Sequence, residues 1–262
     1  MHPIVKFVAQ RILLGLVLLF AASIMIFAGT QILPGDVAQS ILGQSATEQA
    51  LANLRAELGL NDPLVTRYLD WLTAALQGDL GTALTNGQDI ATSMGRRLGN
   101  TLFLAGWAAL ISIPLAITLG LIAVRYAGKW PDKLISAVTL TTVSIPEFLL
   151  GYIVMFYFAV QWRLFPSVST VYDGMPLLDK LNAIALPVMV LVMVVLGHMM
   201  RMTRAAILNV MQSAYIETAE LKGLRPFTII RKHAFPNAIA PIVNVVMLNM
   251  AYLVVGVVVV EV

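Results

Sequence analysis

The sequence predicts an all-α, polytopic helical membrane protein, because of its composition and its five long apolar segments. Of its 262 residues, 59% are hydrophobic and only 12% are charged, and the mean hydropathy is +0.84. A soluble domain this apolar could not cover its surface with polar groups. Each apolar segment reaches the roughly 20 residues that a helix needs to cross a bilayer. The predicted spans are 12–35, 98–124, 134–162 (interrupted by Glu147), 181–200 and 233–260.

The first apolar run is expected to stay in the protein as a span. It is too long for the core of a signal peptide, and no early small-residue cleavage site precedes it. We therefore divide the chain into an amino terminus with a first span (1–33), an extracytoplasmic segment (34–97) and a core domain (98–262).

Basic residues indicate how the chain is oriented. One set of alternate loops carries 11 Lys and Arg, at Lys6, Arg11, 125–133 and 201–232, and the other set carries 6, at 34–97 and 163–180. The positive-inside rule places the first set, with the amino terminus, in the cytoplasm. Because the positive charge gathers on one side of a membrane, the pI near 9.3 gives no reason to expect a nucleic-acid partner.

The segment 34–97 is predicted to form a helical cap after the first span. Residues 47–58 have helical composition and stop at Gly59, and 63–76 carry a helical apolar stripe. A turn is then expected at Gly78, Asp79 and Gly81. The cap either simply packs on the outer membrane face or also docks a soluble extracytoplasmic partner, and the two interpretations are compatible. The stripe comprises Leu64, Tyr68, Trp71, Leu72 and Ala75.

Between the last two spans, residues 214–236 are predicted to form a helix–glycine–helix elbow. In the first helix, 214–222, Glu217 and Glu220 lie early and Lys222 lies at the end, as the helix dipole prefers. Gly223 is placed to end this helix. Pro226 fits the first turn of a second helix, 226–234, which we expect to stop before Pro236. Such an elbow offers a surface that a protein outside the membrane can bind in order to move the attached helices.

Several residues inside the spans are candidates for a polar path. Glu147 either faces the interior of the helix bundle or lies solvated near an interface. Asn244 and Asn249 either line a polar path or bond to another helix. His198 is expected at the cytoplasmic end of the fourth span as an interfacial residue. Prolines in the spans are expected to kink the helices: Pro114, Pro146, Pro187 and Pro241.

Catalytic and metal-binding patterns are missing from the sequence. It has no cysteine, no His pair at metal-ligand spacing and no glycine-rich phosphate loop. We therefore expect no catalytic, cofactor-binding or metal-binding residues, and any ATP would be bound by another chain. The chain itself is interpreted as a transport subunit and not as an enzyme. The alternatives are a passive channel, which needs a ring of selective groups, and an intramembrane enzyme, which needs paired polar groups.

Blocks along the whole chain resemble the permease subunits of bacterial ABC importers of the dipeptide/oligopeptide type. This group also handles nickel, glutathione and opine-like solutes, so the resemblance leaves the solute open. The blocks are LPGD (33–36), ELGLNDPL and YLDWL (57–72), GDLGTAL (78–84), RLGNTLFLA (97–105), VSIPEFLLG (143–151), the elbow, and VVVVEV at the end. The elbow is similar to the family's cytoplasmic loop: Glu217, Gly223 and Pro236 fall on its pattern, while Thr218, His233 and Phe235 depart from it.

The resemblance implies an ABC importer type I permease fold in the bacterial inner membrane. The family has a sixth span, and this sequence stops just before it, so we expect a truncated chain or a missing tail. The implied partners are a second permease subunit, usually a related but distinct chain, two ATP-binding subunits that hold ATP and Mg, and an extracytoplasmic solute-binding protein.

In this family the elbow is a coupling helix that docks in a cleft of the ATPase. The residues expected to couple are Tyr215, Glu217, Thr218, Ala219, Lys222, Gly223 and Pro236, and a possible translocation path comprises Pro146, Glu147, Asn244 and Asn249.

Overall fold

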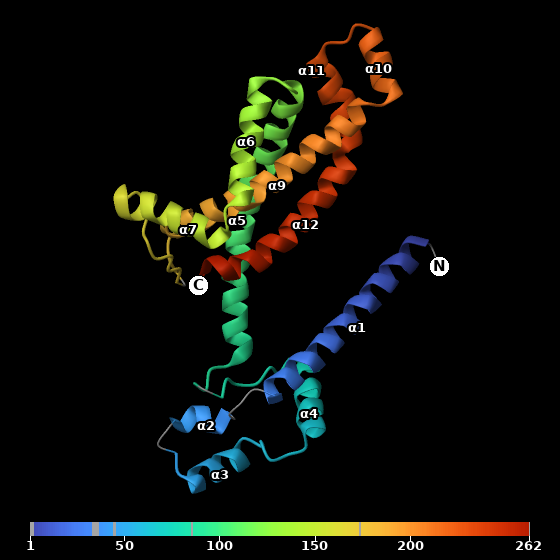
Figure 1. Ribbon diagram of the computed structural model, residues 1–262. Helices are drawn as coiled ribbons and strands as arrows, with labels where there is room; N and C mark the ends of the chain where they lie inside the picture. The colour runs from blue at the N-terminus through green and yellow to red at the C-terminus, as the bar shows by residue number, and fades with distance from the viewer. Residues whose placement is uncertain (1–2, 33–36, 44–45, 85, 173, 262) are drawn as a thin grey trace. The chain divides into compact units, whose positions relative to one another are not determined.

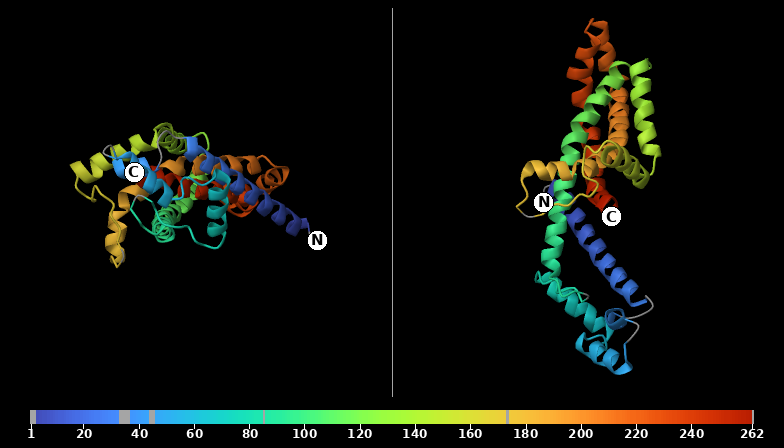
Figure 2. Two further views of the ribbon diagram at one scale, coloured as in Figure 1. Left: turned by 90° about the horizontal axis from the view of Figure 1, so that it is seen from below. Right: turned by 90° about the vertical axis from the view of Figure 1, so that its left-hand side faces the viewer.

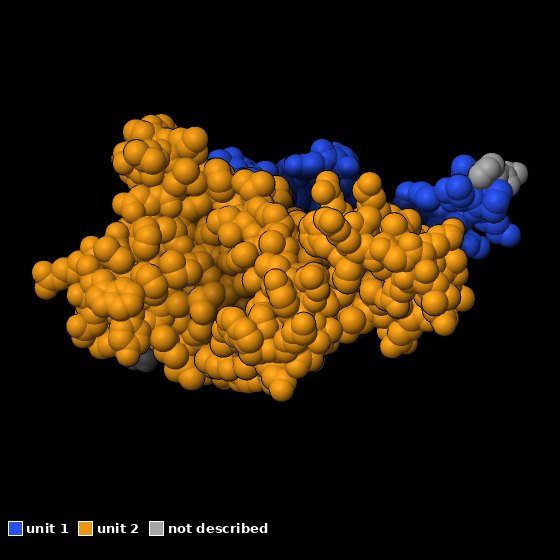
Figure 3. All heavy atoms as spheres, turned by 90° about the horizontal axis from the view of Figure 1, so that it is seen from above, with its two compact units in different colours: residues 1–96 blue, residues 97–262 orange. Residues whose placement is uncertain are grey.

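The computed structural model describes residues 3–32, 37–43, 46–84, 86–172 and 174–261, and these residues are overwhelmingly helical (Figure 1). The chain divides into two compact units, 1–96 and 97–262, coloured separately in Figure 3. The block at 33–36 lies outside the described residues. Within them, four helices are long and apolar enough to cross a membrane, or five if a bent pair counts as one span. A polytopic helical membrane fold is thereby confirmed.

Unit 1 contains α1 to α4 and the first turns of α5. The long helix α1 (Pro3–Ile32) buries none of its residues within the chain, as expected of a helix whose surround is lipid. The helix α4 contacts it through Tyr68: the Tyr68 hydroxyl lies 2.8 Å from the Ser23 hydroxyl, and its ring meets Phe20 and Phe27. Arg67 of α4 also donates to the side chain of Gln31 over 3.2 Å.

The helices predicted for the cap are confirmed, with their ends set by local chemistry. The helix α3 (Glu48–Glu57) is N-capped by Thr47, whose hydroxyl accepts from the Ala50 amide, and Gly59 follows it with φ +63°. The helix α4 (Leu64–Leu76) begins after Pro63. The predicted turn is also present, with the Gly81 amide donating to the Asp79 carboxylate over 2.8 Å. A short helix, α2 (Val37–Leu42), precedes α3.

Unit 2 is organised around α9 (Ala185–Met211), which packs against α6, α7 and α12 (Figures 1 and 2). Two glycines allow very close packing. A Cβ on Gly197 of α9 would lie 2.6 Å from the Thr139 carbonyl of α6, and one on Gly120 of α5 would lie 2.9 Å from Thr203 of α9. Small residues at such crossings let helix backbones approach each other in a membrane. The remaining helices are α5 (Ile90–Arg125), α8 (Leu177–Ala183), α10 (Ala214–Leu221), α11 (Pro226–Ile229) and α12 (Phe235–Glu261).

The third predicted span, 134–162, is not a single straight helix. It consists of α6 (Trp130–Ser144), α7 (Glu147–Met155) and the wide π-helical turn η2 (Phe156–Gln161), and the axis bends by 104° at the break. Pro146 causes the break, because a proline disfavours a helical conformation in the residue before it. Ile145 accordingly has an extended backbone, with ψ 129°.

The expectation that the second elbow helix stops before Pro236 is wrong. After α11 the chain forms a π-helical turn, η3 (Ile230–Ala234), and runs directly into α12, which contains Pro236. The Phe235 amide bonds to the Ile230 carbonyl, five residues back. In this wider turn the backbone hydrogen bonds span five residues, and in α12 they span four. Pro236, which has no N–H to donate, lies where the first pattern changes to the second.

Candidate functional site

The elbow is held to the helical bundle by one apolar face. Ile216 and Ala219 of α10 are buried, as are Ile229 and Ile230, and they form one core with the ends of α5, α9 and α12. Members of this core from those helices are Val124, Ile207, Ala238 and Ile242. The elbow is therefore packed against three long helices at once.

Gly223 makes the corner between the two elbow helices. Its φ is +75°, in the left-handed region, and its amide donates to the Glu220 carbonyl over 2.8 Å. The next amide, of Leu224, donates to the Ala219 carbonyl over 3.3 Å. These two bonds form a Schellman motif, the commonest glycine-based helix end. Lys222, expected as the last residue of a helix 214–222, is the C-cap after Leu221.

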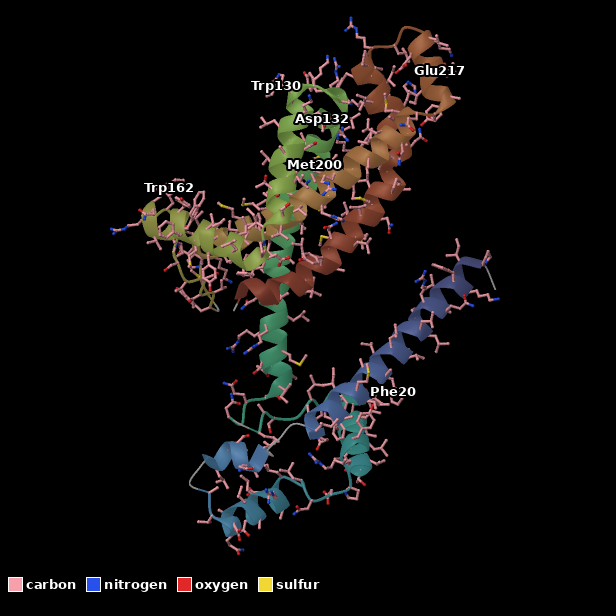
Figure 4. All side chains as sticks on the ribbon, in the orientation of Figure 1. Phe20, Trp130, Asp132, Trp162, Met200 and Glu217 are labelled. Carbon is pink, nitrogen blue, oxygen red and sulfur yellow. The ribbon has the colours of Figure 1, made fainter. Side chains whose placement is uncertain are left out.

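The outward side of the elbow is both apolar and charged. Tyr215, Leu221 and Phe227 are exposed by 45%, 83% and 59%, and Glu217 and Lys222 are also exposed. Large apolar side chains exposed beside charges are typical of a protein-binding surface. Figure 4 shows Glu217 on α10, at the end of unit 2 that carries the elbow.

Other residues expected to couple lie differently. Ala219 is buried in the core below the elbow, so it supports the elbow and does not present a side chain outward. The Thr218 hydroxyl donates to the Ala214 carbonyl within its own helix, over 3.0 Å. Pro236 is exposed, but it lies beyond the π-helical turn, in α12.

A buried ion pair near the elbow was not found by sequence reasoning. Asp132, on the first turn of α6, is only 4% exposed, and Arg204 of α9 grips it through Nε and Nη2, each at 2.8 Å. The Gly128 amide also donates to Asp132 over 2.9 Å, and the Ser136 hydroxyl does so over 3.4 Å. The position of Asp132 after Pro131 signals only a helix start. Its partner lies 72 residues away, and no local pattern connects them.

A second cluster of polar residues lies between α6, α7, α9 and α12. Glu147 and Asn249, two of the path candidates, line one pocket of about 360 Å³, together with Thr142, His198 and Tyr252. The Tyr252 hydroxyl hydrogen-bonds to Glu147 Oε1. The other two candidates are not among the residues lining this pocket: Asn244 is exposed elsewhere on α12, and Pro146 is the N-cap of α7.

The sequence predicts His198 at the cytoplasmic end of the fourth span, but the structure places it well inside a longer helix. It is near the middle of α9, because that helix continues to Met211, well beyond the predicted end at 200. The helical extension after residue 200 contains Arg201 and Arg204, charges that are also typical of a loop outside the membrane. Within the described residues, no group of three or more His, Asp or Glu is arranged to hold a metal ion.

Comparisons with known proteins identify the family to which this arrangement belongs. Residues 112–262 match the family described as binding-protein-dependent transport system inner membrane component, and residues 4–105 match its N-terminal counterpart. A probable peptide ABC transporter permease of Sinorhizobium fredii is 30% identical over 97% of this chain and 82% of its own length.

Two further relatives show the same coverage. A putative peptide transport system permease of Brucella abortus is 34% identical over 98% of this chain and 81% of its own length. A glutathione transport system permease of Escherichia coli is 31% identical with the same coverage. With matches along almost its whole length, the chain belongs to the family of binding-protein-dependent transport system inner membrane components, the permease subunits of ABC importers.

Proposed function

We propose that this chain forms half of the translocation path of an ATP-driven importer for a small peptide or peptide-like solute. A partner ATPase would drive it through the elbow at 214–236. The observation that carries the proposal is the two-sided elbow, which is anchored on α5, α9 and α12 by its apolar face and exposes Tyr215, Leu221 and Phe227 outward. The other partners are a second permease subunit and an extracytoplasmic binding protein. The peptide class comes from the names of the relatives.

Reconstitution tests this function directly. The complex of both permeases and both ATPases is placed in proteoliposomes, and uptake of a labelled dipeptide is measured with its binding protein outside and ATP inside. Uptake should require hydrolysable ATP and the binding protein. Equal uptake with a non-hydrolysable ATP analogue would instead support the passive-channel alternative.

Glutathione is a second candidate solute, because one relative is a glutathione permease. Purifying the partner binding protein and identifying its co-purified ligand by mass spectrometry decides between the two. We expect a short peptide. Recovery of glutathione alone would change the solute and leave the transport mechanism as proposed.

We further propose that the elbow lies in the cytoplasm and the helical cap lies outside, as the positive-inside rule predicts. Single cysteines are suitable probes, because the native chain has none. Residues 53 and 222 are both exposed on the protein surface, so their labelling depends on the side of the membrane. On intact cells, a membrane-impermeant thiol reagent should label Asn53→Cys on α3 but not Lys222→Cys. Labelling at 222 without labelling at 53 would mean that the topology is inverted.

A further inference from the structure

The pocket around Glu147 lies at one level in the helical bundle. The Asp132–Arg204 pair shows that the start of α6 and the last turns of α9 are level with each other. Measured from that pair at about 1.5 Å per residue, Thr142 lies about 15 Å along α6 and His198 about 9 Å along α9. The helices around the pocket are long and apolar enough to cross a membrane, and Glu147 falls inside the third predicted span.

Three polar groups of this pocket use a donor inside the protein, while the His198 side chain forms no hydrogen bond with the described residues. The Asn249 amide donates to the Val245 carbonyl over 2.8 Å, and the Thr142 hydroxyl donates to the Thr139 carbonyl over 2.9 Å. The Tyr252 hydroxyl bonds to Glu147. Among the described residues, the second Glu147 carboxylate oxygen and the Asn249 amide oxygen keep their capacity to accept.

A primary ammonium group fits this inventory. A primary ammonium carries three N–H donors, a positive charge and no acceptor. Glu147 supplies the one acidic side chain among the described residues that line the pocket. Carboxylates within membrane-spanning segments are costly and ordinarily pair with a charge or line a substrate pathway.

We propose that the pocket receives the primary ammonium group of the passing solute, with the Glu147 carboxylate as its acceptor. The inference rests on the proposed function, since it takes the solute to be a peptide with a free amino terminus. Tyr252 hydrogen-bonds to one carboxylate oxygen and joins α7 to α12. The ammonium replaces or shares that hydrogen bond as the solute passes between the two helices, and Asn249 offers a second oxygen.

Transport of matched peptides tests the proposal. In proteoliposomes, uptake of a tripeptide with a free amino terminus is compared with uptake of its N-acetylated form. The binding protein is the same throughout. Its own preference therefore cancels when the uptake rate of each peptide in a variant is divided by the rate of the same peptide in wild type. Glu147→Gln should slow the free peptide about tenfold, as expected for a lost charged hydrogen bond, and the acetylated one much less. Glu147→Asp should keep most of the preference for the free peptide over the acetylated one.

Tyr252→Phe is the control for a purely structural role. It breaks the Tyr252–Glu147 bond but leaves the carboxylate, so the preference for the free amino terminus should persist. If Tyr252→Phe and Glu147→Gln slow both peptides equally, Glu147 serves only to join α7 to α12, and the proposal fails.

A second measurement needs neither the binding protein nor transport. His198→Cys places a thiol in the same pocket of an otherwise cysteine-free chain. In the purified complex it should react faster with an aminoethyl methanethiosulfonate, which carries a primary ammonium, than with the sulfonatoethyl reagent. Adding Glu147→Gln should reduce the ratio of the two rates about tenfold, and an unchanged ratio would overturn the proposal.

The two assays separate this inference from the proposed function. If the wild-type complex imports no peptide but Glu147 still controls the labelling ratio, the peptide assignment is wrong and the cation site stands. If peptides are imported with ATP and neither assay responds to Glu147, the cation site is wrong and the importer stands.

Discussion

Replacing Gly223 by valine should abolish ATP-driven uptake while the chain still inserts in the membrane. Gly223 has φ +75° at the corner of the elbow, where a left-handed backbone is nearly free for glycine and costs other residues roughly 1 kcal/mol or more. Beyond its two chain neighbours, no atom of the described residues lies within 4 Å of an added Cβ, so the effect within this chain comes from backbone strain and not from a clash. Valine would favour an extended backbone there and redirect α11 relative to α10. The measurements are uptake, solute-stimulated ATP hydrolysis and co-purification of the ATPase.

A matched control is available at Gly174, in the loop before α8. It has φ +85° and equally open space, so Gly174→Val introduces the same strain away from the elbow. This control should retain its ATPase. Glu217→Ala, on the exposed side of α10, should weaken coupling less than Gly223→Val does, because it removes a carboxylate and leaves the backbone alone. Wild-type uptake and wild-type ATPase retention in Gly223→Val would leave the elbow an ordinary loop.

Arg204→Met should strongly destabilise the bundle, and it should also uncouple the transporter. It would leave the Asp132 carboxylate, 4% exposed, without its bidentate partner. Removing one partner of a buried ion pair typically costs 3–5 kcal/mol. We expect a loss of about 3 kcal/mol, at the low end, because 30% of the Arg204 side chain still meets solvent. The readouts are thermal stability of the purified complex and ATP-driven uptake.

Arg201→Met, one turn earlier on α9, is the control for the loss of a positive charge. Arg201 is exposed and forms no ion pair within the described part of the chain, so stability and uptake should stay close to wild type. Arg204→Lys should fall between the two, because lysine keeps the charge but cannot reproduce the two-pronged contact. Equal stability of the Arg204→Met and Arg201→Met complexes would show that the Asp132 pair does not hold α6 to α9.

Local chemistry made much of this protein predictable. Thr47 and Pro63 mark where α3 and α4 begin, and Gly223 marks where α10 ends, because caps and breakers act over one turn of chain. The apolar runs predicted membrane helices from length and composition alone. A resemblance in ordered blocks then indicated the permease family, which the comparisons confirmed.

The same local signals were wrong at Pro236 and incomplete at Pro146. Pro236 was expected to end a helix, but the π-helical turn at Ile230–Ala234 lets the helix continue through it. Pro146 was expected to kink a span, and the actual bend of 104° turns the chain into a new direction. A proline shows where the hydrogen-bond ladder is interrupted. The packing of neighbouring helices decides whether the helix forms a wider turn, bends or ends there.

The sequence by itself determined the helices, their membrane character and the glycine corner of the elbow, since each depends on residues within a few positions of one another. Only the tertiary structure decided which polar residues meet. Asp132 finds Arg204 across 72 residues, and Glu147 shares a pocket with His198, Asn249 and Tyr252, while Asn244 does not. These encounters depend on how each helix is rotated about its axis and where it crosses its neighbours. Close approaches such as that of Gly197 to Thr139 fix both quantities, and no periodicity along a single helix records them.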